Sequence, residues 1–222
     1  MAAEAQTARL EAVVDHGADT RSIFLRPERP LAFRPGQFIS CLLPVDGEII
    51  RPYSIASPPE EPDRLELLLN LVPGGVGSRH LFDLPVGATV RFTGPWGTFV
   101  CDRAPAAETV FIAESTAIAP IRPMLHRVLA TGPAHPVHLL HATDHVLYGP
   151  ELDAAARTHP LLHVARVPTR ALEAEVRKRW IEADADRSRR FFVCGVGAIV
   201  PALRDLLRGA GYERRAVQYE KW

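Results

Sequence analysis

The first half of the chain consists of short apolar or alternating runs that are separated by Pro and Gly. Such runs, bounded by turn residues, are typical of strands. The pattern predicts six strands, over residues 10–14, 21–25, 37–43, 50–55, 65–71 and 89–92. Pro35-Gly36 and Asp46-Gly47 are turn signals, and the second predicts a hairpin into the strand over residues 50–55. We therefore expect a small antiparallel β-barrel.

After Ala104 the pattern changes to apolar runs that alternate with helical segments, and residues 104–107 are predicted to form a linker. Strands are predicted over residues 109–113, 137–141, 161–167, 190–194 and 216–219, and helices over residues 118–130, 151–157, 170–181 and 198–208. This alternation favours a parallel, doubly wound sheet with helices on both faces. The sequence thus predicts two domains, a β-barrel over residues 1–104 and an α/β domain over residues 105–222.

Charge and cysteine content exclude several kinds of function. The 26 basic and 26 acidic residues balance, which argues against a nucleic-acid or membrane partner. No run approaches the ~18 apolar residues of a membrane span, so a cytoplasmic protein is expected. Three distant cysteines, Cys41, Cys101 and Cys194, exclude a disulfide framework and a four-cysteine metal or iron–sulfur site within this chain. His138, His141 and His145 could suggest a metal, but His138 and His145 flank a strand end without a matching carboxylate or cysteine cluster, which favours a solvated rim.

The segment over residues 51–57 combines a guanidinium group, an aromatic ring and a hydroxyl group. In a strand, Arg51 and Tyr53 lie on the same face, with Ser54 beside them. Arg binds phosphate in a bidentate manner and Tyr offers a stacking surface, so the segment suits a flavin dinucleotide. The alternative is an edge strand of the barrel, because Pro52 cannot donate a hydrogen bond to a neighbouring strand.

Two glycine-rich segments follow. In the first, Gly75-Val76-Gly77-Ser78 is predicted to open a short helix that Ser78 caps, which makes it a second candidate for phosphate binding; a plain loop is the alternative. In the second, Gly94-Pro95 and Gly97 predict a tight corner, with Trp96 and Phe99 as packing residues.

Four motifs in this order resemble the flavin-binding barrel of the ferredoxin–NADP reductase superfamily: Pro35-Gly36-Gln37-Phe38, Arg51-Pro52-Tyr53-Ser54, Gly75-Val76-Gly77-Ser78 and the segment over residues 94–99. The resemblance implies FAD as the cofactor. It implies that Arg51 binds the flavin pyrophosphate, that Tyr53 stacks on the isoalloxazine ring and that Ser54 lies near N5. The glycine–serine turn would hold phosphate.

The resemblance extends through the second half. Ligands of doubly wound sheets bind beyond the carboxyl ends of the strands, which selects residues 114–120 and 195–198 as facing loops. The first of these resembles the nicotinamide-nucleotide loop, so Thr116 and Ala117 are predicted to contact NAD(P)H; Ser115 and Ala117 stand where glycines are usual. Glu114 would repel a pyrophosphate that binds the loop amides, which predicts weaker nucleotide binding.

Cys194-Gly195 resembles the motif that places a thiol beside the nicotinamide, where it acts as a positioning contact. By the same resemblance Trp222 covers the second flavin face and Glu220 aids hydrogen bonding or proton supply; a surface Trp pinned to the barrel is the alternative. Asp144 near the end of the second strand favours NADH over NADPH, although Arg157 or Arg166 leaves NADPH open.

These residues predict a flavoprotein that passes hydride from NAD(P)H to FAD, with Ser54, Cys194, Glu220 and Trp222 as the catalytic residues. Because no iron–sulfur cluster is expected in this chain, the electrons would leave to a separate ferredoxin, flavodoxin or oxygenase component. Two alternatives stay open. One is a flavin-bound electron-transfer subunit of a larger complex with a weakened or lost nucleotide site, and the other is a binding module without redox function. The sequence does not predict the oligomeric state.

Overall fold

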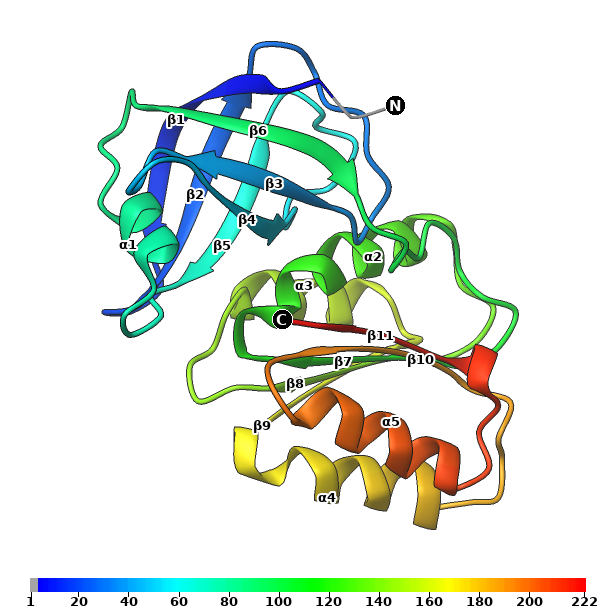
Figure 1. Ribbon diagram of the computed structural model, residues 1–222. Helices are drawn as coiled ribbons and strands as arrows, with labels where there is room; N and C mark the ends of the chain where they lie inside the picture. The colour runs from blue at the N-terminus through cyan, green and yellow to red at the C-terminus, as the bar shows by residue number, and fades with distance from the viewer. Residues whose placement is uncertain (1–3) are drawn as a thin grey trace.

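The computed structural model describes residues 4–222, and its first sheet holds six antiparallel strands (Figure 1). The strand order is β4-β3-β6-β1-β2-β5, and a bridge between Ile55 and Leu67 brings the ends of the sheet together. The strands are β1 (Gln6–Asp15), β2 (Thr20–Pro27), β3 (Phe38–Leu43), β4 (Ile49–Ser54), β5 (Leu65–Asn70) and β6 (Thr89–Trp96). All six predicted strands and the barrel architecture are confirmed.

Alternating burial along the strands gives the barrel its core. In β3, for example, Ile39, Cys41 and Leu43 are buried while the residues between them are only partly covered. The predicted hairpin between β3 and β4 is confirmed: Asp46 and Gly47 both adopt positive φ, at 47° and 108°. Asp and Gly tolerate this conformation better than other residues, which explains the turn at this position.

The corner predicted at Gly94-Pro95 and Gly97 lies later than expected: β6 continues to Trp96, with a register irregularity against β3, and Gly97 directly after it has a φ of 102°. β6 lies between β1 and β3, but its pairing with β1 ends at Phe92. Beyond that point Pro95 has no neighbour on the β1 side to which an N–H group would have to donate, so a proline is tolerated. Phe99 is buried, as predicted, whereas Trp96 is only partly buried.

The second sheet holds five parallel strands in the order β11-β10-β7-β8-β9. The strands are β7 (Thr109–Glu114), β8 (Val137–Ala142), β9 (Leu162–Val167), β10 (Arg190–Gly195) and β11 (Val217–Lys221), and the helices of the chain are α1 (Val76–Phe82), α2 (Ile118–Ala130), α3 (Gly149–Thr158), α4 (Leu172–Arg177) and α5 (Ile199–Gly209). The chain builds the sheet outward from β7 in one direction and then crosses to β10 on its other side. The topological switch point therefore lies between β7 and β10, and the doubly wound prediction is confirmed.

Helices cover both faces of this sheet, each over its own core. One core joins α2 and α3 to the sheet and includes Ala56 and Leu68 of the barrel, so the barrel packs on this face. The other joins α4 and α5 to the opposite face. The helix predicted over residues 170–181 is shorter than expected: a 3₁₀ turn precedes α4 and a π-helical turn (Lys178–Glu182) follows it and carries the buried Trp180.

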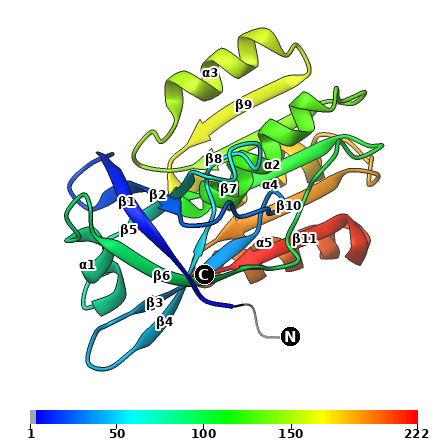
Figure 2. The same cartoon turned by 90° about the horizontal axis from the view of Figure 1, so that it is seen from above.

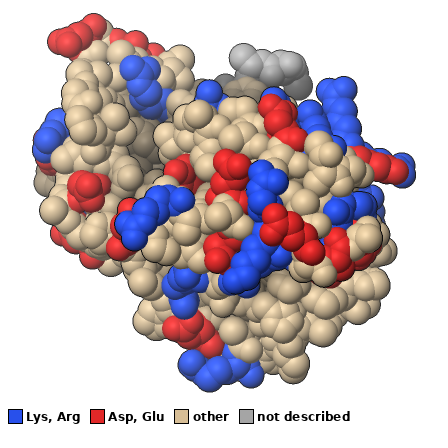
Figure 3. All heavy atoms as spheres, turned by 90° about the horizontal axis from the view of Figure 1, so that it is seen from below, with Lys and Arg blue, Asp and Glu red and all other residues tan. Residues whose placement is uncertain are grey.

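The first sheet ends at Trp96 and the second begins at Thr109, while the domain boundary at residues 104 and 105 stays a prediction. In Figures 1 and 2 the carboxyl end of β11 lies where the barrel meets the second sheet. Within residues 4–222 the structure contains no helix whose length and apolar character would let it span a bilayer. Figure 3, which views the molecule from the side of α4 and α5, shows basic and acidic side chains intermixed, as in the ion pair between Arg204 and Asp205 of α5.

Candidate functional site

A cavity of about 490 Å³ lies between the barrel and the carboxyl edge of the parallel sheet. It has the size of a typical small-molecule site. All nine residues that the sequence assigned to FAD line it, together with the predicted nucleotide contacts Thr116 and Ala117: Arg51, Pro52, Tyr53, Ser54, Gly75, Val76, Gly77, Ser78 and Trp222. The structure thus brings together residues that are up to 171 positions apart in the sequence.

Strand β4 presents Arg51 and Tyr53 to this cavity. The Arg51 side chain is exposed and passes over Gly77 of α1, where a Cβ atom would lie 2.9 Å from Cγ of Arg51. The absence of a side chain at Gly77 therefore makes room for the guanidinium stem. Burial raises the pKa of the Tyr53 phenol, so the ring is neutral and offers an uncharged stacking surface.

Ser54 at the end of β4 is 7% exposed, and its Oγ atom has no hydrogen-bond partner within residues 4–222. A buried hydroxyl group without a partner is uncommon, because it has lost its hydrogen bonds to water. Its place on the cavity wall makes Ser54 available to a polar atom of a bound ligand.

The glycine-rich turn is arranged differently from the prediction. Gly75, not Ser78, is the N-cap of α1. The Ser78 hydroxyl accepts a hydrogen bond from the Val72 amide at 3.1 Å and donates one to the Gly75 carbonyl at 3.0 Å. The hydroxyl thus stabilises the turn, and the backbone amides at the start of α1, which lack intrahelical acceptors, are the groups left for a phosphate.

The loop after β7 contains a residue in an unusual conformation. Ser115 adopts a φ of 52°, a conformation that favours glycine. Its carbonyl accepts a hydrogen bond of 3.0 Å from Nε2 of His141, which is fully buried at the end of β8. Burial lowers the pKa of His141 to about 4, so the imidazole is neutral. His141 therefore supports the loop from within the protein.

Glu114 ends β7 and connects the two facing loops. One carboxylate oxygen accepts a hydrogen bond of 2.9 Å from the Val196 amide, beyond the end of β10. A Cβ atom at Gly195 would lie 3.0 Å from the same oxygen, so this glycine lets the carboxylate approach. The Glu114 side chain, which was predicted to disfavour a nucleotide, therefore reaches across the switch point and accepts a hydrogen bond from the Val196 amide of the facing loop.

Trp222 is fixed by its backbone on both sides. Its amide donates to the Gly195 carbonyl at 3.1 Å, and its carbonyl accepts from the Gly197 amide at 3.2 Å. Its ring meets Phe38 edge-on, with the ring centroids 5.9 Å apart. These contacts hold the indole at the cavity, which Tyr53 of β4 also lines.

Cys194 and Glu220 are neighbours in the register of β10 and β11, outside the cavity lining. Burial raises the pKa of the Cys194 thiol, so it is neutral, which suits a positioning contact better than a nucleophile. Burial also raises the pKa of Glu220 to about 7, and its Oε1 atom has no partner among the described residues. Glu220 is therefore a group that can exchange a proton near neutral pH.

The residues that bear on nucleotide choice lie apart from the cavity. Asp144 is exposed in the loop after β8. Arg166 donates to Asp153 at 2.8 Å and to the Gly149 carbonyl at 3.3 Å, so it is already engaged by α3. Residues 4–222 contain no group of three or more His, Cys, Asp or Glu side chains arranged for a metal ion. His138 stacks on His163 instead, with ring centroids 5.0 Å apart.

Comparison with known proteins assigns the class. Residues 8–101 match the family model described as the oxidoreductase FAD-binding domain. Ferredoxin–NADP reductase B of Sorangium cellulosum is 33% identical over 208 residues, which cover 86% of this chain and 85% of that protein. A second relative comes from a Ralstonia species and is the ferredoxin–NAD(P)⁺ reductase component of its naphthalene 1,2-dioxygenase/salicylate 5-hydroxylase systems. It is 30% identical over 204 residues, which cover 87% of this chain and 61% of that protein. The crystal structure of cytochrome P450 reductase GcoB from Amycolatopsis matches 98% of this chain and 69% of its own, with 29% identity and a TM-score of 0.85.

A flavin-binding barrel joined to a nucleotide-binding sheet defines an FAD-dependent NAD(P)H oxidoreductase. The chain belongs to the ferredoxin–NADP reductase family. The family resemblance, FAD as cofactor and NAD(P)H as substrate are thereby confirmed. The cavity also fits FAD on its own evidence, because it combines a guanidinium group, an unpaired buried hydroxyl, free helix amides and two aromatic rings.

Proposed function

We propose that this protein is a reductase that takes electrons from NAD(P)H and delivers them to a separate protein, either a ferredoxin or an oxygenase component. One observation carries the proposal: a single cavity joins the flavin motifs of the barrel to the nucleotide loop of the second sheet. Bound there, FAD supplies the redox chemistry, since it accepts a hydride and releases electrons one at a time. The relatives named above, which include the reductase component of an oxygenase system, support such an acceptor.

The chain's own residues are assigned as follows. Tyr53 and Trp222 hold the flavin ring between them, and Arg51 with the first amides of α1 binds the pyrophosphate. Ser54 offers its hydroxyl to the reactive edge of the ring. Glu220 exchanges a proton and Cys194 packs beside the nicotinamide. Of these residues, Arg51, Tyr53, Ser54 and Trp222 line one cavity, whereas Cys194 and Glu220 are neighbours in the register of β10 and β11 outside its lining.

Nucleotide entry is assigned to the switch point, with Thr116, Ala117 and Gly195 as backbone contacts. We propose NADH as the preferred substrate, because Asp144 is acidic and Arg166 is held by Asp153. The limiting reduction rates and dissociation constants with NADH and NADPH measure this preference. A lower dissociation constant for NADPH would contradict it.

Anaerobic mixing tests the function directly. We expect the purified protein to be yellow and its flavin absorbance to bleach promptly when NADH or NADPH is added. Tyr53→Ala should lose FAD, whereas Tyr219→Ala, which changes a tyrosine outside the cavity, should retain it. A colourless protein that does not bind added FAD would overturn the proposal.

A second candidate function rests on Glu114. Its carboxylate occupies the Val196 amide and places a negative charge where a pyrophosphate would pass, which favours an electron-transfer subunit that accepts electrons without a nucleotide. A protein that stays yellow after addition of either nucleotide would support this candidate. For the reductase, we expect Glu114→Gly to tighten NADH binding by roughly two- to fivefold, the equivalent of about 0.3–1 kcal/mol at a helix N-terminus. An unchanged dissociation constant would contradict the effect assigned to Glu114.

A further inference from the structure

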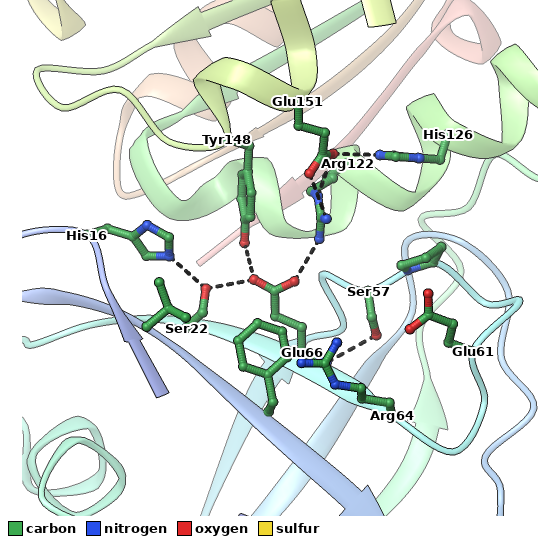
Figure 4. Close-up of a pocket in the computed structure, with 13 residues that line it drawn as sticks. His16, Ser22, Ser57, Glu61, Arg64, Glu66, Arg122, His126, Tyr148 and Glu151 are labelled. Carbon is green, nitrogen blue, oxygen red and sulfur yellow. Dashed lines mark hydrogen bonds and ion pairs between the residues drawn. The ribbon is translucent and has the colours of Figure 1, made fainter. Parts of the chain in front are cut away.

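A second hollow, of about 610 Å³, lies where the barrel meets α2 and α3. Among the described residues it shares no lining residue with the flavin cavity. Figure 4 shows that Glu66, Arg122, Tyr148 and Glu151 point toward one another within it. This network joins charged groups from both sheets' domains, and it was not predicted from the sequence.

Glu66 is the barrel's contribution. It lies on β5 between leucines and is only 4% exposed. Its carboxylate accepts hydrogen bonds from the Ser22 hydroxyl at 2.7 Å and the Tyr148 hydroxyl at 2.8 Å, and it pairs with Nη1 of Arg122 at 2.7 Å. These three partners offset the cost of burying the Glu66 carboxylate, and the carboxylate in turn fixes the position of each partner.

Arg122 of α2 forms the centre of the network. Besides Glu66, Nη1 donates to the Ala56 carbonyl of the barrel at 2.8 Å. Nε and Nη2 donate to the two carboxylate oxygens of Glu151 on α3, each at 2.8 Å. The guanidinium carbon also lies 4.4 Å from the centre of the Tyr148 ring. One side chain thereby joins two elements of the barrel to α3.

The Glu151 carboxylate of the network is ionised at neutral pH. Burial alone would raise the pKa of Glu151, but hydrogen bonds from His126 and Arg122 outweigh it and lower the pKa to about 2. Tyr148 adopts a φ of 54°, which is uncommon for a bulky residue and is maintained by the packing around it. A backbone held in this conformation indicates that the surrounding geometry is tightly determined.

The two joined elements both reach the flavin cavity. On β5, Leu68, Leu69 and Asn70 line it, two to four residues beyond Glu66. On α2, Ala119 lines it three residues before Arg122, and the nucleotide loop immediately precedes the helix. The bond between Glu66 and Arg122 therefore fixes the distance between β5 on the flavin side of the cavity and α2 on its nucleotide side.

We propose that Arg122 is a positioning residue, which holds the first turn of α2 and the nucleotide loop at a fixed distance from β5. The inference rests on the proposed function, since it assigns the loop to NAD(P)H. Reactions between two bound groups are sensitive to displacements of about 1 Å, which can cost on the order of a hundredfold in rate. Loss of Arg122 should therefore slow the reaction between the two cofactors without removing either from its site.

The test compares Arg122→Met with Arg127→Met in the FAD-bound protein. Arg127 lies on the same helix and also pairs across to the barrel side, with Glu60 at 3.0 Å, but its side chain is 37% exposed. We expect Arg122→Met to lower the limiting rate of flavin reduction by NAD(P)H at least tenfold, while FAD affinity and the rate of reduction by dithionite change less than twofold. Arg127→Met should change none of these. Equal limiting rates in the two variants, or a parallel loss of the dithionite rate, would overturn the proposal.

A second readout needs no nucleotide. Hydrogen–deuterium exchange over residues 114–122 should be faster in Arg122→Met than in Arg127→Met, with exchange in the barrel strands unchanged. Unchanged exchange over residues 114–122 would overturn the positioning role. Failure of the wild type to be reduced by either nucleotide would instead overturn the proposed function, and the exchange result would still decide whether Arg122 fixes the loop.

Arg122→Met leaves the Glu66 charge buried without its partner, which could prevent folding. The double variant Glu66→Gln with Arg122→Met removes both charges and should fold. We expect it to show the same slow reduction and fast exchange, because the link between β5 and α2 is absent. Recovery of the wild-type rate in the double variant would overturn the proposal.

Discussion

The Glu220 carboxyl group is partly buried beside Cys194, and this burial raises its pKa from an ordinary 4.5 to about 7. Between these two values the folded protein retains a proton that the unfolded chain releases. The free energy of unfolding therefore falls as the pH rises from 4.5 to 7 and becomes level above it. Replacement by glutamine removes the titration and should flatten this part of the curve.

The size of the effect follows from the shift. Each pKa unit corresponds to about 1.4 kcal/mol, so complete linkage would amount to roughly 3 kcal/mol between pH 4.5 and 7. Because the side chain keeps some contact with solvent, which screens the interaction, we expect roughly 1–3 kcal/mol. Urea denaturation of the wild type and Glu220→Gln at pH 5 and pH 8 measures the difference.

Glu213→Gln is the matched control, since it changes an exposed carboxylate in the turn before β11. It should leave the pH dependence of the wild type intact. The same comparison applies to function: the rate of flavin reduction by NAD(P)H should show a titration near pH 7 that Glu220→Gln abolishes. Parallel stability curves for the wild type and Glu220→Gln would refute the assignment of this pKa to Glu220.

Three further substitutions separate local geometry from ligand binding. Ser115→Gly relieves a positive φ of 52° and should raise the stability by up to about 1 kcal/mol, seen as a melting temperature a few degrees higher; a lower melting temperature would contradict this. Gly77→Ala places a Cβ atom 2.9 Å from Cγ of Arg51, so FAD affinity should fall roughly tenfold while the apoprotein is equally or more stable by thermal denaturation. Trp222→Ala should weaken FAD binding in a fluorescence titration, because one of the two rings at the cavity is lost; an unchanged affinity would count against the ring contact.

Strong local patterns account for the parts of the structure that the sequence predicted. Every strand of the barrel coincides with a run of apolar or alternating residues. After Ala104 the alternation of strands and helices predicts a parallel sheet. The FAD residues were found because they form contiguous motifs. Their gathering at one cavity required the fold, since Trp222 reaches the barrel only when β11 pairs with β10.

The burial of His141 follows from a local pattern in the sequence. The period of two along β8 places Val137, Leu139 and His141 on one face, and the first two are buried under α2. The same period places His141 on this buried face, and its side chain is fully buried. Its bond to Ser115 could not be predicted, because it depends on how the next loop folds back.

The network around Arg122 had one signal in the sequence. Glu66 is the only charged residue in the run from Leu65 to Leu69, and a carboxylate in a buried strand requires partners. Those partners, Arg122 and Tyr148, lie 56 and 82 residues away, so neither a motif nor a period could identify them. The contacts that fix one domain against the other are thus the least accessible to sequence analysis.

Two residues at the start of the nucleotide loop, Glu114 and Ser115, are hydrogen-bonded to neighbouring elements. Ser115 adopts a positive φ and its backbone carbonyl accepts a hydrogen bond from His141, while the Glu114 carboxylate accepts one from the Val196 amide, a bond that a glycine at position 114 could not make. Because Glu114 engages the Val196 amide, one backbone amide of the facing loop is not open to a pyrophosphate. In the proposed function a nucleotide must therefore exchange the Glu114–Val196 bond for its own. The affinity of this protein for NAD(P)H is then set by that exchange as much as by the contacts the nucleotide gains.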